Sequence, residues 1–148
     1  MRPYAFTLIE LLIVVSIIAI LGTMVVPSFS KFQSSSLLSE TTAQIEQSLR
    51  LARGKALAGF NDVGSGIYFD IANNKYIIYS GNSYNSRLIS YDLEFNWDES
   101  LEINIPNGPE IIFLKGSGYA SSTSYIQLKH NNQIKTITIN SYGFVDVE

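Results

Sequence analysis

The chain has 148 residues, of which 46% are hydrophobic and 16% are charged, with a formal net charge of -3 and no cysteine. This length allows about one domain with a modest core. The negative charge gives the whole chain no electrostatic footprint for nucleic acid, which needs clustered Lys and Arg. The lack of cysteine excludes disulfides, thiolate catalysis and Cys-ligated metal sites.

A long apolar run at residues 6–26 follows a five-residue start. As a helix it would span about 30 Å, which matches the core of a bilayer. A cleaved secretory signal is one interpretation, indicated by Arg2 ahead of the run, but Gly22-Thr23-Met24 is a poor cleavage site. A plain single-pass anchor is a second interpretation, and it fits every residue except Glu10.

Glu10 is the one acid within the apolar run. A carboxylate in a membrane helix costs on the order of 3 kcal/mol near the bilayer centre and less toward an end, so it usually has a functional reason. The alternative without a functional partner is an acid that snorkels to the membrane surface from the end of the helix.

The segment Phe6-Thr7-Leu8-Ile9-Glu10-Leu11-Leu12 resembles the processing motif of type IV pilins and type II secretion pseudopilins. In that family a prepilin peptidase cuts before the Phe and methylates the new amine. The resemblance implies leader cleavage between Ala5 and Phe6, with N-methylation of Phe6, although Ala5 stands where the family normally has Gly. It also implies that Glu10 pairs with the terminal amine of a neighbouring subunit during assembly, because an unpaired buried charge is costly.

Pro27 comes directly after the apolar run. It has no N–H and clashes with the preceding turn, so a helix kink or a locally loosened turn is predicted there. Gly22 adds local flexibility, and the family resemblance implies that this stretch can melt when a filament assembles.

An amphipathic helix is predicted over residues 27–59, with Gly59 as its stop. From Leu38 onward its apolar residues recur at the spacing of one helix face. Glu46 lies one turn before Arg50, which predicts an ion pair. The apolar stripe contains Phe29, Phe32, Leu38, Ile45, Leu49, Ala52 and Ala56, and the opposite face carries Glu40, Gln44, Gln47 and Ser48.

Arg50, Arg53 and Lys55 form the one basic cluster of the sequence. One interpretation is that these cations complement the dipole at the C-terminal end of the helix. The other is contact with an acidic partner subunit or with DNA.

The rest of the chain consists of short β-rich runs separated by turn residues. Antiparallel hairpins are the economical connection, and Ile137 and Ile139 are predicted on a buried strand face. The predicted strands are 67–71, 75–79, 87–91, 101–105, 110–114, 125–129, 134–139 and 144–147.

The predicted fold is therefore α+β and pilin-like, a long kinked N-terminal helix packed on an antiparallel sheet. It comprises a leader (1–5), a transmembrane or filament-core helix (6–26), the amphipathic helix (27–59) and a β-rich head (60–148).

The segments Leu49–Ala56 and Ile137–Val145 resemble the head of H-type minor pseudopilins and FimT-like minor pilins. This resemblance implies a structural minor subunit of a type IV pilus or a type II secretion pseudopilus, and it leaves residues 82–109 unexplained. A DNA-binding minor pilin for DNA uptake is one alternative, although the chain ends in Asp146-Val147-Glu148 where such pilins carry basic residues. A major pilin is another.

No catalytic residue, metal or cofactor is expected. His130 is the only histidine, so a usual zinc site cannot form. Asp92, Glu94, Asp98 and Glu99 do not have the spacing of a calcium-binding loop. A membrane-anchored enzyme stays as an alternative without a catalytic constellation to support it.

The family resemblance also implies partners and a location. The partners are other pilin or pseudopilin subunits, the prepilin peptidase, the inner-membrane assembly platform, and membrane lipid before assembly, whereas nucleic acid is not expected. The chain would cross the cytoplasmic membrane once, with its head outside the cytoplasm, and then enter a filament.

Overall fold

The computed structural model describes residues 6–148, apart from the side chains of residues 23–32. The chain divides into two compact units, Met1–Ser36 and Leu37–Glu148. The helix α1 (Leu8–Leu57) contributes residues to both units. In the described residues it is followed by the strands β1 (Ser65–Asp70), β2 (Lys75–Ser80), β3 (Leu93–Asn96), β4 (Glu102–Asn104), β5 (Glu110–Phe113), β6 (Ser124–His130), β7 (Gln133–Ile139) and β8 (Val145–Val147).

The first unit contains the N-terminal part of α1. Its large hydrophobic side chains between Phe6 and Leu21 are all exposed, from 47% at Val14 to 82% at Leu8. Among the described residues, no helix combines the length and the apolar character that a membrane span requires. The side chain of Pro27 lies outside the described residues, and the kink predicted there stays a prediction.

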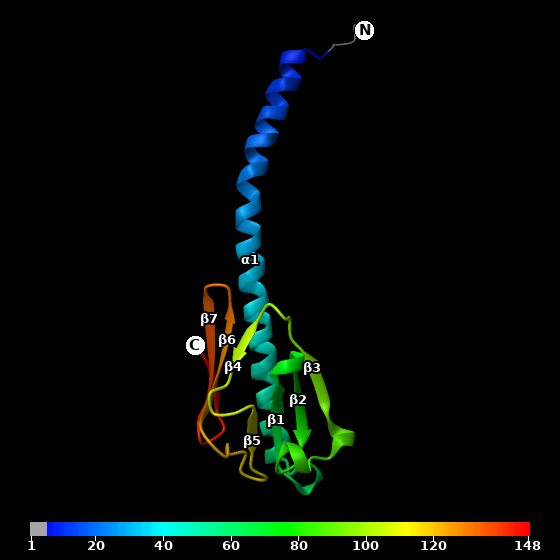
Figure 1. Cartoon of the computed structure of the whole chain (residues 1–148), viewed down its shortest axis with the longest axis vertical. Helices are drawn as coiled ribbons and strands as arrows, with labels where there is room; N and C mark the ends of the chain where they lie inside the picture. The colour runs from blue at the N-terminus through cyan, green and yellow to red at the C-terminus, as the bar shows by residue number, and fades with distance from the viewer. Residues whose placement is uncertain (1–5) are drawn as a thin grey trace. The chain divides into compact units, whose positions relative to one another are not determined.

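The second unit, called the head here, packs the C-terminal part of α1 with two antiparallel sheets. Within the described residues the sheets have the strand orders β3-β2-β1-β5 and β4-β6-β7-β8. In Figure 1 the cyan part of α1 lies between the green strands β1 to β3 and the orange strands β6 and β7. The predicted α+β class and antiparallel pairing are confirmed, but the head has two sheets where the sequence predicted one.

The apolar stripe predicted on the helix forms one wall of the core. Leu38 is 2% exposed, and Ile45, Leu49, Ala52 and Ala56 are fully buried. They join one hydrophobic cluster with residues of both sheets, among them Ile67, Phe69, Ile126 and Ile137. Full burial of a Leu or Ile side chain contributes about 1.5–3 kcal/mol, so the stripe stabilises the packing of the C-terminal part of α1 in the head. Phe29 and Phe32 lie outside the described side chains.

The prediction for Ser48 was wrong. Ser48 is 6% exposed and its hydroxyl is 3.0 Å from the hydroxyl of the buried Tyr76. It lies three residues after Ile45 and four before Ala52, so the helical period places it on the core face. A hydroxyl is tolerated there because it has a hydrogen-bond partner.

Gly59 ends the helix as predicted. Its φ is 62°, in the left-handed region that glycine adopts at little cost, and its amide donates to the carbonyl of Ala56 at 3.1 Å. The short helix η1 (Phe60–Asp62) then leads the chain toward β1.

Most predicted strands are present, and the exception is 87–91. This segment contains the 3-10 helix η4 (Ile89–Tyr91), and the edge strand β3 begins two residues after it. Within this segment the Leu88 amide donates to the carbonyl of Ser80, the last residue of β2, at 2.8 Å, and Arg87 makes polar contacts with its own loop. The buried positions of Ile137 and Ile139 on β7 are confirmed.

Candidate functional site

The N-terminal motif forms a capping box at the start of α1. The carboxylate of Glu10 accepts hydrogen bonds from the backbone amide of Thr7 at 3.2 Å and from its hydroxyl at 3.0 Å. In return the Thr7 hydroxyl accepts from the Glu10 amide at 3.3 Å. This reciprocal pair satisfies donors that the first turn of a helix leaves open. The signal for this cap is present in the sequence, as a Thr followed three residues later by a Glu ahead of an apolar run.

The capping box places the acid of the motif on the first turn of the helix. A carboxylate there is stabilised by the positive end of the helix dipole. Cleavage between Ala5 and Phe6 would create a new amine one residue before Thr7, on the same end of the helix. Phe6 is 76% exposed, and Ala5 lies outside the described residues, as do the other leader residues.

The three cations of the basic cluster make different contacts. Arg50 contacts Glu46 at 2.7 Å, which confirms the predicted ion pair, and it also donates to the carbonyl of Val145 at 3.1 Å. The ammonium of Lys55 lies 5.7 Å from the centre of the Phe60 ring. The predicted contact of this cluster with a partner subunit stays a prediction.

Arg53 holds the final hairpin and a neighbouring loop against the helix. Its guanidinium donates to the carbonyls of Gly118 and Tyr142, both at 3.3 Å, and lies 4.4 Å from the centre of the Phe144 ring. A Cβ at Gly143 would lie 2.1 Å from the Gly118 carbonyl oxygen, so only glycine fits at this approach. Arg53 and Gly143 belong to the two segments that carry the head resemblance, and the structure brings these segments together.

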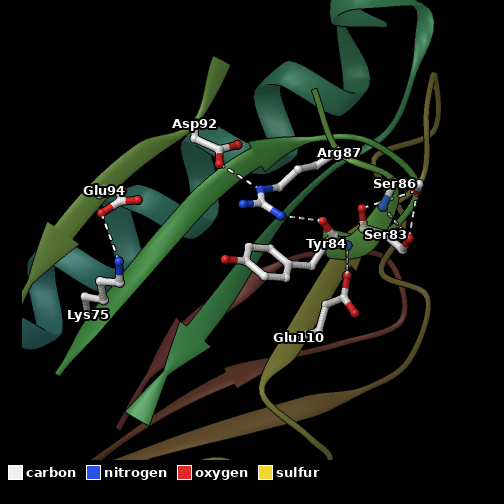
Figure 2. Close-up of polar contacts among 8 residues, drawn as sticks. All are labelled: Lys75, Ser83, Tyr84, Ser86, Arg87, Asp92, Glu94 and Glu110. Atoms are coloured by element: carbon white, nitrogen blue, oxygen red, sulfur yellow. Dashed lines mark hydrogen bonds and ion pairs between the residues drawn. The ribbon is translucent and has the colours of Figure 1, made fainter. Parts of the chain in front are cut away.

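Residues 81–92 form a polar and aromatic loop between β2 and β3, and from residue 82 onward the resemblance left this part of the chain unexplained (Figure 2). Arg87 donates to the carboxylate of Asp92 at 2.7 Å and to the carbonyl of Tyr84 at 2.9 Å. The Asp92 carboxylate raises the pKa of Arg87. The Tyr84 ring stacks on Tyr68 with centroids 3.9 Å apart, and the Arg87 guanidinium lies 3.8 Å from the same ring. These contacts fix the loop on the first sheet.

Glu110 ties the same loop to the strand β5. One oxygen of its carboxylate accepts from the Tyr79 hydroxyl and from the Tyr84 amide, each at 2.6 Å. Burial, and then the contact with Glu110, raise the pKa of Tyr79. A Cβ at Gly66 would lie 2.5 Å from the Tyr79 hydroxyl, so glycine at this position leaves room for the tyrosine.

Three of the four acids weighed as calcium ligands, Asp92, Glu94 and Asp98, bind different partners. Asp92 pairs with Arg87, and Glu94 pairs with Lys75 at 3.1 Å (Figure 2). Asp98 accepts from the amide and the hydroxyl of Ser100 at 2.9 and 2.6 Å, and these bonds lower its pKa. The described part of the chain contains no group of three or more acids, histidines or cysteines that could hold a metal ion.

Comparisons with known proteins concern the N-terminal segment and the fold. Residues 1–26 match the family model for the prokaryotic N-terminal methylation motif. No sequence among the curated proteins matches that of this chain.

The fold is similar to that of the minor pseudopilin EpsH from the type 2 secretion system of Vibrio cholerae. The TM-score is 0.61 at 13% sequence identity, and the match covers 76% of this chain and 96% of that chain. At this identity the likeness concerns the fold. The chain thus combines an N-terminal methylation motif with a fold similar to that of a minor pseudopilin.

Proposed function

We propose that the protein is a structural minor subunit of a pilus-like filament, assembled through its N-terminal helix. The observation that carries this proposal is a methylation motif at residues 1–26 in a chain whose fold is similar, over 76% of its length, to that of a minor pseudopilin. The capping box supports it, because Glu10 is held on the first turn of the helix, close in sequence to the amine that processing would create.

Processing is the first step of the proposal. A prepilin peptidase would cut between Ala5 and Phe6 and methylate Phe6, while the apolar part of α1 anchors the chain in the cytoplasmic membrane. The head would lie outside the cytoplasm. An assembly platform would then move the chain into the filament, where the exposed apolar side chains of residues 6–22 would pack against neighbouring helices.

Mass spectrometry of the N-terminus tests processing. The full chain is expressed with and without an active prepilin peptidase. We expect a mature chain that begins with methylated Phe6 only when the peptidase is active. An intact Met1 in the presence of the peptidase would contradict the proposal. Ala5→Gly is the matched variant, expected to be processed at least as fast because it restores the residue usual in the family.

Three variants separate the charge of Glu10 from its capping role. Glu10→Gln keeps an acceptor for the Thr7 amide but removes the charge, whereas Thr7→Ala keeps the charge and removes the two hydroxyl bonds of the cap. Glu10→Val removes the charge and the acceptor together. If Glu10 acts by pairing with an amine in the filament, Gln and Val variants should both fail to enter sheared filaments while Thr7→Ala still enters. Wild-type incorporation of Glu10→Gln or of Glu10→Val would show that the charge has no role in assembly.

A further inference from the structure

We propose that a groove on the outer face of the second sheet binds a neutral saccharide. The groove has a volume of about 690 Å³, within the range of about 300–1,000 Å³ that small-molecule sites occupy. Its base is a row of three cross-strand neighbours, Tyr125 on β6, Thr138 on β7 and Asp146 on β8. Asn107, Asn140 and Phe144 add further lining from the loops at the same end of the sheet.

Two exposed aromatic rings give the groove an apolar surface. Tyr125 is 38% exposed and Phe144 is 58% exposed. The face of an aromatic ring is electron-rich and attracts groups with a partial positive charge, such as the C–H groups on the flat face of a sugar. The Arg53 guanidinium, 4.4 Å from the centre of the Phe144 ring, holds that ring in place.

The polar side chains are oriented by bonds that they already make. The Asn140 oxygen accepts from the Phe144 amide at 3.0 Å, which leaves its NH₂ group to donate to a ligand. The Asn107 NH₂ group donates to the Thr123 carbonyl at 2.7 Å, which leaves its oxygen to accept. One oxygen of Asp146 accepts from the Val147 amide at 3.1 Å, and the second can accept from a ligand. Sugar hydroxyls both donate and accept, so they match this mixed set.

The charge of the lining selects against other ligands. Of the ten described residues that line the groove, Asp146 is charged and none is basic. A phosphate, sulfate or nucleotide would therefore meet a carboxylate and no basic lining residue. The nearby guanidiniums of Arg50 and Arg53 already bind Glu46 and the backbone carbonyls of Val145, Gly118 and Tyr142. One carboxylate is also too few for a calcium site, which uses six to eight oxygen ligands.

The dimensions of the row fit a ligand of two rings. Neighbouring strands lie about 4.8 Å apart, so the row from Tyr125 to Asp146 extends about 10 Å across three strands. This length accommodates a disaccharide lying across the strands, with its rings near the aromatic side chains and its hydroxyls near the amides and the carboxylate.

Saturation-transfer NMR on the full chain tests the proposal. The detergent must lack a sugar head group, because a maltoside could occupy the groove. The probes are maltose and N,N′-diacetylchitobiose, and glucose 6-phosphate is the anionic control. We expect transfer to at least one disaccharide with a Kd on the order of 1 mM, and none to the phosphate.

Matched variants locate the binding. Tyr125→Ala and Phe144→Ala should each reduce the transferred signal about five-fold or more, a loss of about 1 kcal/mol in binding free energy. Tyr142→Ala is the control, because Tyr142 is also 58% exposed and does not line the groove. If near-UV circular dichroism shows that Phe144→Ala disturbs the fold, Thr138→Val and Asp146→Asn replace it, and each should reduce the signal.

Three results would overturn the proposal. The first is that no transfer to either disaccharide occurs at about 20 mM, some 20-fold above the expected Kd. The second is an unchanged signal in the groove variants. The third is stronger transfer to glucose 6-phosphate than to the neutral sugars. The experiment does not depend on processing or filament assembly, because the unprocessed chain contains the whole groove.

Discussion

The N-terminal segment and the head differ in how far their apolar side chains are exposed. Between Phe6 and Leu21 the large hydrophobic side chains are 47–82% exposed, whereas Ile45, Ile67 and Phe113 in the head are fully buried. Soluble surfaces rarely carry an apolar area as extended as that of the N-terminal segment. The head therefore stabilises itself, and the N-terminal segment depends on an apolar environment that the proposed filament and membrane would provide.

The largest expected effect comes from a cavity in the head. Phe113→Ala removes a fully buried ring and should lower the free energy of unfolding by about 3–5 kcal/mol. Leu12→Ala, at a side chain that is 57% exposed, should change it by less than about 0.5 kcal/mol. Denaturation of the full chain in detergent, followed by near-UV circular dichroism, measures both. Equal losses would break the contrast between the two regions.

A pair of glycines gives the second test. At Gly143 φ is 76° and a Cβ would clash with the Gly118 carbonyl, so Gly143→Ala should destabilise the head by about 2 kcal/mol or more. No atom lies within 4 Å of a Cβ at Gly22, so Gly22→Ala should instead stabilise the helix by about 0.5–1 kcal/mol. The melting temperature of the head should stay unchanged. Thermal melts and far-UV spectra separate the two effects. A tolerated Gly143→Ala would mean that the final hairpin adapts easily.

Two helical serines sharpen the same contrast. Ser48→Ala leaves the buried Tyr76 hydroxyl without its partner and should lower stability by about 1–2 kcal/mol. The exposed Ser16 bonds the Leu12 carbonyl within its own helix at 2.7 Å, so Ser16→Ala should change stability by less than about 0.5 kcal/mol. Chemical denaturation gives both values. The double variant Ser48→Ala/Tyr76→Phe should recover part of the loss, and no recovery would argue against this bond.

The smallest expected effect depends on pH. The pKa of Tyr79 is raised in the folded head, so the unfolded chain loses this proton first as the pH increases. The stability from Tyr79 is therefore fully present below about pH 10 and declines above it. Tyr79→Phe should be about 1 kcal/mol less stable at neutral pH, and the two proteins should converge above about pH 10. A difference that stays constant up to pH 11 would contradict this assignment.

Local patterns in the sequence predicted the helix and much of the sheet structure. The stripe from Leu38 to Ala56 and the stop at Gly59 follow from helical period and backbone freedom, which depend on neighbours in the chain. The same period places Ser48 on the buried face, but its polarity led to the wrong assignment. Polarity alone cannot predict burial when a distant partner, here Tyr76, satisfies the hydroxyl.

The loop at residues 81–92 could not be predicted in this way. A β-rich composition indicated a strand at 87–91, and the structure has the 3-10 helix η4 there instead. The contacts that favour this geometry join Arg87 to Asp92 locally and Tyr84 to Tyr68 and Glu110 on other strands. Partners that distant in sequence leave no periodic pattern.

For the N-terminal motif, the sequence alone was enough to establish the apolar run, the acid at Glu10 and the resemblance to a processed pilin. The tertiary structure decided what surrounds the other candidates. It showed that Arg53 binds the final hairpin, and it aligned Tyr125, Thr138 and Asp146 in one groove. The physical reason is the separation in sequence between the interacting residues. Capping and helical period act over three or four residues, whereas strand register brings together residues that are far apart in the sequence.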